Sequence, residues 1–433
     1  MELLSPAGTL KSMRYAFAYG ADAVYAGLPR YSLRARNNEF NLENIRIGIK
    51  EAHMLNKKFF IVCNIYPHNS KVKTFLKDIR PIIEMQPDAL IMSDPGLIMM
   101  VKDQWPETEI HLSVQSNVVN YATVQFWERM GITRIILSRE LSLDQIAEIR
   151  ALCPNIELEV FVHGALCMAY SGRCLLSGYM NHRDANQGVC TNACRWKYKT
   201  TPATTTEWGD NIPNQSACCN NNPAETKTLL IQQTNKSDSP TMSMEEDEHG
   251  TYLLNSKDLR AIHHVETLYK MGINCIKIEG RTKSTFYVAR TAQLYKAAIN
   301  DAVAGRPFNK KLMDELESLS SRGYTEGLLR RHVFDEYQNY EQGYSKSTHQ
   351  QLVGESISYD TKTQFATVEV KNKFQLGDTL EVMSPSRNAT WTLKEMLNDK
   401  HKPISLAPGS GIRVKIRLPD SINGEHAMIM KYL

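Results

Sequence analysis

The stretch Cys275-Ile-Lys-Ile278, followed by Glu279-Gly-Arg281 and the helical pattern Ser284–Ala304, is the last of eight strand–helix units in the sequence. Amphipathic patterns such as Leu10–Tyr19 separate most of the earlier strands. The seven earlier predicted strands are Glu2–Leu4, Ala23–Tyr25, Phe59–Asn64, Ala89–Met92, Ile110–Val114, Arg134–Leu137 and Glu157–Val162. Eight such units predict an α/β fold, a TIM-like (β/α)8 barrel. A doubly wound open sheet is the alternative, which the count of eight and the long closing helix disfavour.

Polar residues follow most of the predicted strands at their carboxyl ends, which meet at one mouth in a barrel. They are Ser5, Asn64, Ser93, Asp94, Gln115, Asn117, Ser138, Arg139, Glu140, His163, Glu279 and Arg281. Any single one could instead cap the helix that follows it, as Ser, Asn and Asp often do. Their convergence predicts that the chemistry takes place at this mouth.

The composition changes along the chain and predicts three regions. Residues 1–305 form the barrel, and a cysteine-rich segment follows its seventh strand. Residues 200–250 are rich in Thr, Asn, Ser, Glu and Pro and predict a flexible insertion in the barrel. Residues 306–350 predict a helical connector. In residues 351–433, alternating strand patterns interrupted by Gly and Pro predict a small all-β domain, β-barrel-like or a sandwich.

The composition is that of an ordinary globular protein, with 433 residues, 42% hydrophobic and 23% charged. The net charge of +4 is too small to indicate nucleic-acid binding by itself. The start Met1-Glu-Leu-Leu-Ser5 does not resemble a signal peptide, and no apolar run reaches the roughly 20 residues of a membrane span. We therefore expect a cytoplasmic protein with no membrane partner. In that reducing compartment, nine cysteines indicate metal binding or catalysis rather than disulfides.

Four cysteines have the most specific spacing in the chain, Cys-x6-Cys-x15-Cys-x3-Cys, at Cys167, Cys174, Cys190 and Cys194. Four thiolates can bind either a zinc ion or an iron–sulfur cluster. Zinc sites usually contain two closely spaced pairs, and here only the second pair is close. The spacing therefore favours a cluster, while zinc or unrelated cysteines remain alternatives. Because Cys167 follows the seventh strand, the site is expected at the mouth.

His163 lies four residues before Cys167, and a Cys/His nucleophilic pair would indicate a cysteine peptidase. That interpretation leaves three nearby cysteines unexplained. The sequence also contains neither a Gly-x-Ser-x-Gly nor a His-Glu-x-x-His motif. A peptidase is therefore the weaker hypothesis.

Several segments resemble one family over nearly the whole chain. They are Glu2–Gly8, Gly20–Gly27, Ser93–Gly96, Glu159–Ser177, Cys190–Trp196, Ile278–Lys283 and Arg322–Gly327. The pattern is similar to that of the collagenase-like peptidase family U32, and in particular to its members that hydroxylate bacterial tRNA. Residues 200–250 are the main departure, since their composition is peculiar to this sequence.

The resemblance implies a tRNA-modifying enzyme that forms 5-hydroxyuridine at the wobble position. It implies a 4Fe–4S cluster, held by the four cysteines of the constellation, and prephenate as co-substrate, with no use of molecular oxygen. The expected RNA footprint combines the terminal β domain with basic residues at the barrel rim. A peptidase and a tRNA-binding accessory protein without its own chemistry remain the alternatives.

Prephenate carries two carboxylates, so cations are expected at the mouth. Arg139, Arg281 and Lys283 are the predicted substrate-binding residues, because Arg can grip a carboxylate through two parallel hydrogen bonds. An ion pair with Glu279 or Glu140 is the structural alternative for these cations. His163 and Glu279 are the predicted acid–base groups. A cluster with four cysteine ligands leaves no iron open, so we expect it to pass electrons or polarise neighbours, and an electron donor is left open as a partner.

Overall fold

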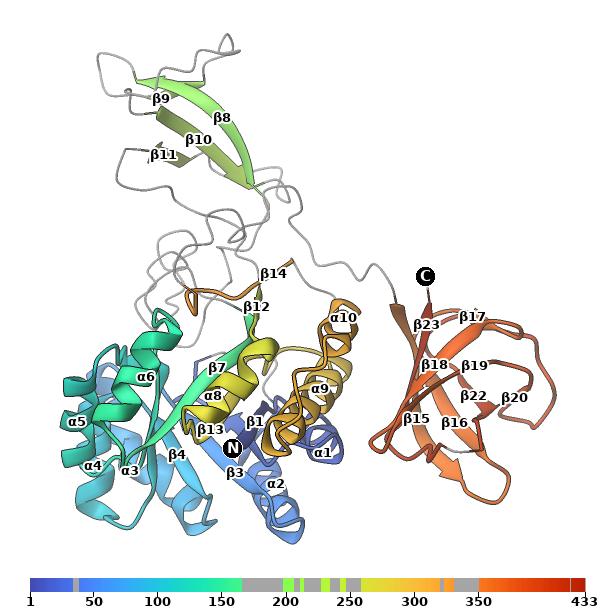
Figure 1. Ribbon diagram of the computed structural model, residues 1–433, viewed down its shortest axis with the longest axis horizontal. Coiled ribbons are helices and arrows are strands. Elements are labelled where there is room, and N and C mark those ends of the chain that lie inside the picture. Colours follow the sequence, from blue (N-terminus) through green and yellow to red (C-terminus); the bar gives the residue numbers. More distant parts are fainter. Residues whose placement is uncertain are drawn as a thin grey trace.

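The computed structural model describes residues 1–33, 39–165, 258–319, 323–330, 350–420 and 422–432, together with the backbone of four strands between 198 and 246. An N-terminal α/β body and a C-terminal β domain account for most of these residues (Figure 1). Among the described helices, none has the length and apolar character that crossing a membrane requires.

Eight parallel strands form a closed barrel. They are β1 (Glu2–Pro6), β2 (Ala23–Gly27), β3 (Lys58–Cys63), β4 (Ala89–Met92), β5 (Ile110–Leu112), β6 (Arg134–Ile136), β7 (Glu157–Ala165) and β13 (Cys275–Ile278). Each strand pairs with the next, and β13 pairs with both β7 and β1. The predicted barrel is therefore confirmed. The open-sheet alternative is wrong, since it would leave β1 or β13 without its second partner.

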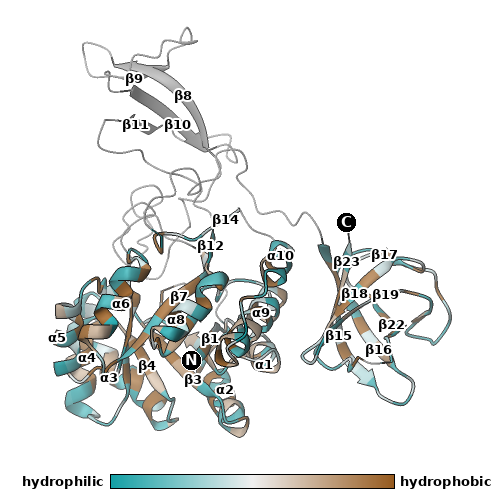
Figure 2. Cartoon of the chain, viewed as in Figure 1, coloured by the Kyte–Doolittle hydropathy of each residue, from teal (hydrophilic) through white to brown (hydrophobic). Residues whose placement is uncertain are grey.

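Helices cover the outside of the barrel. They are α1 (Leu10–Ala18), α2 (Leu42–Met54), α3 (Asn69–Glu84), α4 (Pro95–Gln104), α5 (Tyr121–Arg129), α6 (Leu143–Leu152), α8 (Val265–Lys270), α9 (Thr285–Val303) and α10 (Lys311–Glu317). Several begin at a side-chain cap: Ser142, for example, forms a reciprocal capping box with Gln145. Apolar residues concentrate on the strands and on the helix faces against them (Figure 2), which places the core around the barrel wall.

Strand β7 is three residues longer than the predicted Glu157–Val162, because a distant segment pairs with its end. After the insertion, β12 (Asp258–Arg260) runs antiparallel to residues 163–165 of β7, and β14 (Tyr324–Thr325) pairs with β12. The partner of this extension lies almost 100 positions away in the sequence, so a local pattern cannot reveal it. The pairing brings His163 and Tyr324 to the same part of the mouth.

The insertion contains four strands, β8 (Tyr198–Thr205), β9 (Asn211–Pro213), β10 (Lys227–Gln233) and β11 (Met242–Glu246), which pair antiparallel. The predicted flexibility of residues 200–250 falls largely outside the described residues and stays a prediction. The same holds for Cys218 and Cys219, which we expect to be solvated rather than ligands.

The C-terminal part is an antiparallel β domain with its own core, as predicted. Its strands are β15 (Gln350–Asp360), β16 (Phe365–Val370), β17 (Phe374–Gln375), β18 (Thr379–Met383), β19 (Asn388–Thr392), β20 (Met396–Asn398), β21 (Leu406–Ala407), β22 (Arg413–Arg417) and β23 (Met428–Tyr432). Seven of them form one sheet in the order β19-β18-β23-β15-β16-β22-β20. This domain packs on α1 and α9 of the barrel body.

Polar contacts fix this packing. The hydroxyl of Tyr19 lies 3.0 Å from the carbonyl oxygen of Met383 and 2.9 Å from that of His426. Arg290, on α9 and 1% exposed, donates to Glu381 of β18 at 3.0 Å. Buried hydrogen bonds that satisfy charged groups specify one arrangement of two surfaces. The barrel body and the β domain are therefore in direct contact through paired side chains.

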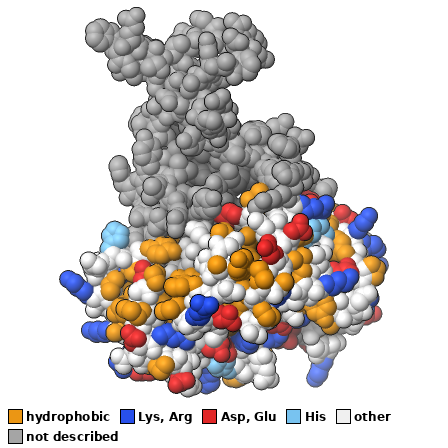
Figure 3. All heavy atoms as spheres, turned by 60° about the vertical axis from the view of Figure 1, so that its left-hand side comes forward, with side chains coloured by type: hydrophobic (Ala, Val, Ile, Leu, Met, Phe, Trp, Pro, Cys, Tyr) orange, Lys and Arg blue, Asp and Glu red, His pale blue; other side chains and the backbone are white. Residues whose placement is uncertain are grey.

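The outer helical face on the α4–α6 side differs from the interior of the barrel. Figure 3 shows apolar side chains there among charges of both signs. Exposed apolar residues of this side include Met99 of α4 and Phe126 of α5.

Candidate functional site

The structure brings the five predicted catalytic and substrate-binding residues onto one rim, formed by the ends of β6, β7, β12 and β13. Arg139 lies 3.7 Å from the carboxylate of Glu279, and the backbone N–H of Glu279 donates to the carbonyl of His163 at 2.8 Å. Lys283 lies 3.9 Å from Asp258 of β12. Arg281 donates to the carbonyl oxygen of Leu33. The predicted convergence on one mouth is thus observed for these side chains.

Arg139 stacks on an aromatic ring. Its guanidinium carbon lies 3.9 Å from the ring centroid of Phe161, which holds the guanidinium plane in a cation–π contact. The distance to Glu279 is long for a charge-assisted hydrogen bond, and the Nε of Arg139 is buried without an acceptor among the described residues. The ion-pair alternative therefore accounts for only part of the hydrogen-bonding capacity of Arg139. The remainder suits an anionic ligand.

Arg281 and Lys283 lie against aromatic rings as well. The guanidinium of Arg281, 9% exposed, lies 5.8 Å from the ring centroid of Tyr25. The ammonium of Lys283 lies 5.4 Å from the ring centroid of Tyr287. Cations held beside apolar rings are less hydrated than cations in water, which strengthens their attraction to a carboxylate.

His163 is almost fully buried, at 1% exposed. Burial lowers its pKa to about 3, with smaller contributions from the positive charges of Lys283 and Arg260. The imidazole therefore stays neutral at physiological pH. Its predicted role in acid–base chemistry stays a prediction, and the neutral form is the one that would take part.

Gly164 allows β7 and β13 to approach closely beside the site. Its φ of +104° is disfavoured for other residues, and a Cβ there would lie 2.4 Å from the carbonyl oxygen of Glu279. Only glycine fits this position without moving the backbone that carries Glu279. This steric requirement explains why a glycine stands between His163 and Ala165.

The four cysteines Cys167, Cys174, Cys190 and Cys194 lie outside the described residues. β7 ends at Ala165 on the rim, two residues before Cys167. The described cysteines, Cys63, Cys153 and Cys275, are buried, and burial raises the pKa of each thiol. They are therefore poor sources of the thiolate that a cluster needs. The predicted iron–sulfur cluster on Cys167, Cys174, Cys190 and Cys194 stays a prediction.

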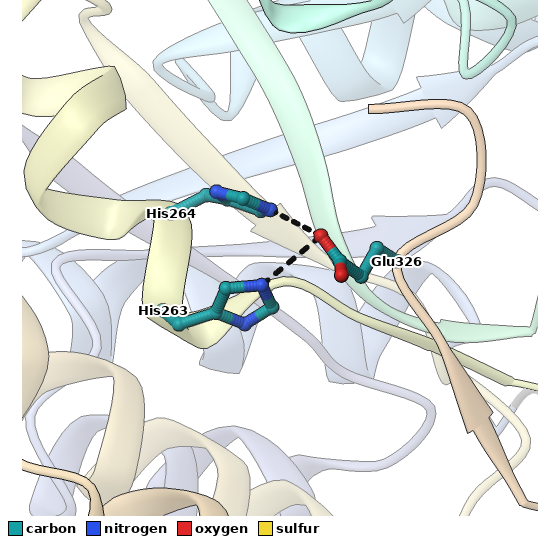
Figure 4. Close-up of side chains that lie close together, drawn as sticks. All are labelled: His263, His264 and Glu326. Carbon is teal, nitrogen blue, oxygen red and sulfur yellow. Dashed lines mark hydrogen bonds and ion pairs between the residues drawn. The ribbon is translucent and has the colours of Figure 1, made fainter. Parts of the chain in front are cut away.

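A second group of metal-type ligands was not anticipated from the sequence. The Nε2 atoms of His263 and His264 lie 3.1 and 2.7 Å from the same carboxylate oxygen of Glu326 (Figure 4). Two imidazoles and a carboxylate can bind zinc or non-haem iron. Here Arg330 also donates to that oxygen, at 2.8 Å. We interpret the group as a clip, made of histidine hydrogen bonds and the Arg330–Glu326 ion pair, that ties the segment after β14 to the 3-10 helix η4 (Ile262–His264).

The sequence also contained no indication that three tyrosines surround His163. The rings of Tyr287, Tyr295 and Tyr324 have centroids within 5.7 Å of the imidazole. They come from α9 and β14, so their approach depends on how these elements pack over β7. In the sequence, Tyr287 and Tyr295 appear only as part of an amphipathic helix pattern, which gives no signal of a site.

Comparisons with known proteins agree with this architecture. Residues 8–339 match the model of peptidase family U32, and residues 348–431 match the model of the peptidase family U32 C-terminal domain. The chain is 59% identical, over its whole length and 96% of the relative, to "tRNA hydroxylation protein P" of Haemophilus influenzae. It is 58% identical, over 99% of the chain and 96% of the relative, to the protein of that name in Escherichia coli.

A more distant relative has a different name. "23S rRNA 5-hydroxycytidine C2501 synthase" of Escherichia coli is 31% identical over 71% of this chain and 40% of that protein. The matches to both family models and to full-length relatives cover the barrel and the terminal β domain alike. The chain therefore belongs to peptidase family U32.

Proposed function

We propose that this protein hydroxylates tRNA, forming 5-hydroxyuridine at the wobble position with prephenate as co-substrate and without molecular oxygen. The observation that carries the proposal is the 59% identity, over the full length, to a relative named as a tRNA hydroxylation protein. The related rRNA 5-hydroxycytidine synthase supports the same class of reaction, addition of a hydroxyl group to a pyrimidine of RNA.

The rim supports this chemistry through its own residues. Arg139 and Arg281 would bind the two carboxylates of the co-substrate, with Lys283 as an additional point charge. Glu279, which borders Arg139, would hold or release a proton at its carboxylate. A 4Fe–4S cluster on Cys167, Cys174, Cys190 and Cys194 would supply electron transfer when bound. His163 would contribute a neutral imidazole to the wall of the site.

Two other functions make different predictions. A peptidase would need a nucleophile activated by a neighbouring base, and the described rings that lie against the His163 ring are those of Tyr287, Tyr295 and Tyr324. An accessory protein would bind tRNA without changing it.

Nucleoside analysis of tRNA from a deletion strain tests the proposal. Loss of 5-hydroxyuridine, restored by the intact gene, is the expected result. Unchanged 5-hydroxyuridine would contradict it and favour the peptidase. Reconstitution with pure anaerobic protein, prephenate and tRNA then separates an enzyme from an accessory protein, because only the enzyme forms the product in this mixture.

Replacing Arg139 with Lys should raise the KM for prephenate by about tenfold, while kcat changes less. Lys keeps the charge but cannot form two parallel hydrogen bonds or stack as a plane on Phe161. Steady-state hydroxylation at varied prephenate measures the change. Arg129→Lys on the outer helix α5 is the control and should behave like wild type. An equal KM in the Arg139 and Arg129 variants would remove Arg139 from the binding site.

A basic strip on the β domain is suited to bind the phosphate backbone of tRNA. Arg413, Lys415 and Arg417 alternate with buried residues along β22 and therefore share its outer face. Lys415 also donates to His401 at 3.0 Å, in the turn that carries Lys400 and Lys402. We call these five basic residues, Lys400, Lys402, Arg413, Lys415 and Arg417, the β22 strip.

Reversing two charges of the β22 strip, Arg413→Glu with Arg417→Glu, should weaken tRNA binding at least tenfold at low salt. It should also reduce the slope of log affinity against log salt by about 2, since two phosphate contacts are lost. Binding titrations at several salt concentrations measure both quantities. Lys50→Glu with Lys73→Glu, exposed on α2 and α3, reverses the same charge elsewhere and is the matched control. Equal losses in both pairs, or wild-type binding indifferent to salt, would contradict the strip as a tRNA contact.

A further inference from the structure

The hydrogen bonds of Tyr295 determine which nitrogen of His163 carries the proton. The Tyr295 hydroxyl is fully buried and lies 2.7 Å from the carbonyl oxygen of Val162 and 3.3 Å from Nδ1 of His163. A carbonyl oxygen can only accept, so the single hydroxyl hydrogen points at Val162. The contact with Nδ1 is then a hydrogen bond only if Nδ1 carries the hydrogen and the tyrosine oxygen accepts it. A neutral imidazole in this state has a bare lone pair on Nε2.

The described surroundings of Nε2 offer no donor to that lone pair. Among the described residues, no group donates to it, and the atom is buried. The two other tyrosine hydroxyls beside the ring are already used as donors. Tyr287 donates to the carbonyl oxygen of Glu279 at 2.7 Å, and Tyr324 donates to that of Leu316 at 3.2 Å. A buried acceptor without a donor is unfavourable, so this position is prepared for a group that arrives with a ligand.

We propose that Tyr295 is a positioning residue that holds His163 in the Nδ1–H tautomer, so that Nε2 accepts a hydrogen bond from an N–H or O–H group of a bound substrate. The opposite tautomer would present an N–H to that group and repel it. The identity of the substrate rests on the proposed function, whereas the tautomer rests on the geometry alone.

Tyr295→Phe tests the inference, because it keeps the ring in place and removes only the oxygen that accepts from Nδ1. The probe is 15N NMR of protein with labelled histidine, in which protonated and bare ring nitrogens have well-separated shifts. His163→Gln identifies the His163 signals among those of the 12 histidines. We expect a protonated Nδ1 in wild type, and a mixture or a protonated Nε2 in Tyr295→Phe. Tyr287→Phe, whose hydroxyl contacts the Glu279 backbone instead, should keep the wild-type tautomer.

A protonated Nε2 in the wild type, or an unchanged tautomer in Tyr295→Phe, would overturn the role of Tyr295. Saturation with tRNA or with prephenate should move the wild-type Nε2 signal as it accepts a hydrogen bond. If neither ligand moves it, Nε2 is not the acceptor. In hydroxylation assays we expect kcat/KM to fall 10- to 100-fold in Tyr295→Phe. If the wild type does not hydroxylate tRNA, the proposed function fails, but the tautomer measurement still decides the present inference.

Discussion

Replacing Glu159 with Gln should destabilise the barrel by about 3 kcal/mol, because the change removes the anion that pairs with the buried Lys277. It also removes one of the three carboxylates around Arg134, which keeps Glu2 and Glu157. Glu159 is fully buried in β7 and lies 2.9 Å from Lys277 and 3.5 Å from Arg134. Those two cations are themselves only 4% and 3% exposed at their side chains. Gln can accept a hydrogen bond but has no charge to offset that of Lys277 in this low-dielectric interior.

The same arginine provides a matched control. Glu157 also pairs with Arg134, at 2.7 Å, but its side chain is 46% exposed. Water solvates an exposed carboxylate well and weakens its ion pair, so Glu157→Gln should cost at most about 1 kcal/mol. Denaturant unfolding of both variants at pH 7 measures the difference. Similar losses in the two variants would mean that burial does not control the strength of this network.

Sequence patterns predicted the eight barrel strands because each is a short apolar run with a helix after it, a local signal. The extension of β7 to Ala165 was missed because its partner, β12, lies beyond the insertion. In the β domain, alternating patterns predict strands at Leu352–Ser358, Phe365–Val370, Thr379–Met383, Ile412–Arg417 and Ala427–Tyr432. The strands β17, β19, β20 and β21 were missed, since they have two to five residues and no apolar alternation. Local patterns of residues thus reveal elements that are long or periodic, while short strands depend on neighbours that the pattern does not contain.

The candidate site likewise has features that local sequence patterns predict and features that they do not. Strand ends placed Arg139, His163 and Glu279 on one rim, because parallel strands in a barrel share a direction. The contact between Tyr295 and His163 could not be predicted, since it depends on the rotation of α9 over β7. The ion network of Glu159 with Lys277 was equally hidden. Strand alternation indicates which face a charge occupies, but not which distant charge it meets.

Replacing any one of Cys167, Cys174, Cys190 and Cys194 with Ala should abolish the visible absorbance of the anaerobically purified protein and reduce hydroxylation by orders of magnitude. Each thiolate is expected to supply one of four bonds to the cluster, and loss of one exposes an iron to water and oxygen. Optical spectra together with iron and acid-labile sulfide analysis measure the cluster content. Retention of full iron and sulfide in all four variants would contradict the cluster.

Cys153→Ala is the matched control for this series. Its sulfur lies 3.6 Å from the carbonyl oxygen of Tyr121, the residue is 2% exposed, and burial raises the pKa of its thiol. This variant loses a cysteine but should keep iron, sulfide and activity. The metal analysis also separates the alternatives for the wild type, because a zinc site would contain zinc without sulfide and unrelated cysteines would contain neither. Equal iron and sulfide in wild type and Cys153→Ala, with loss in the four other variants, would therefore assign the cluster to those four residues.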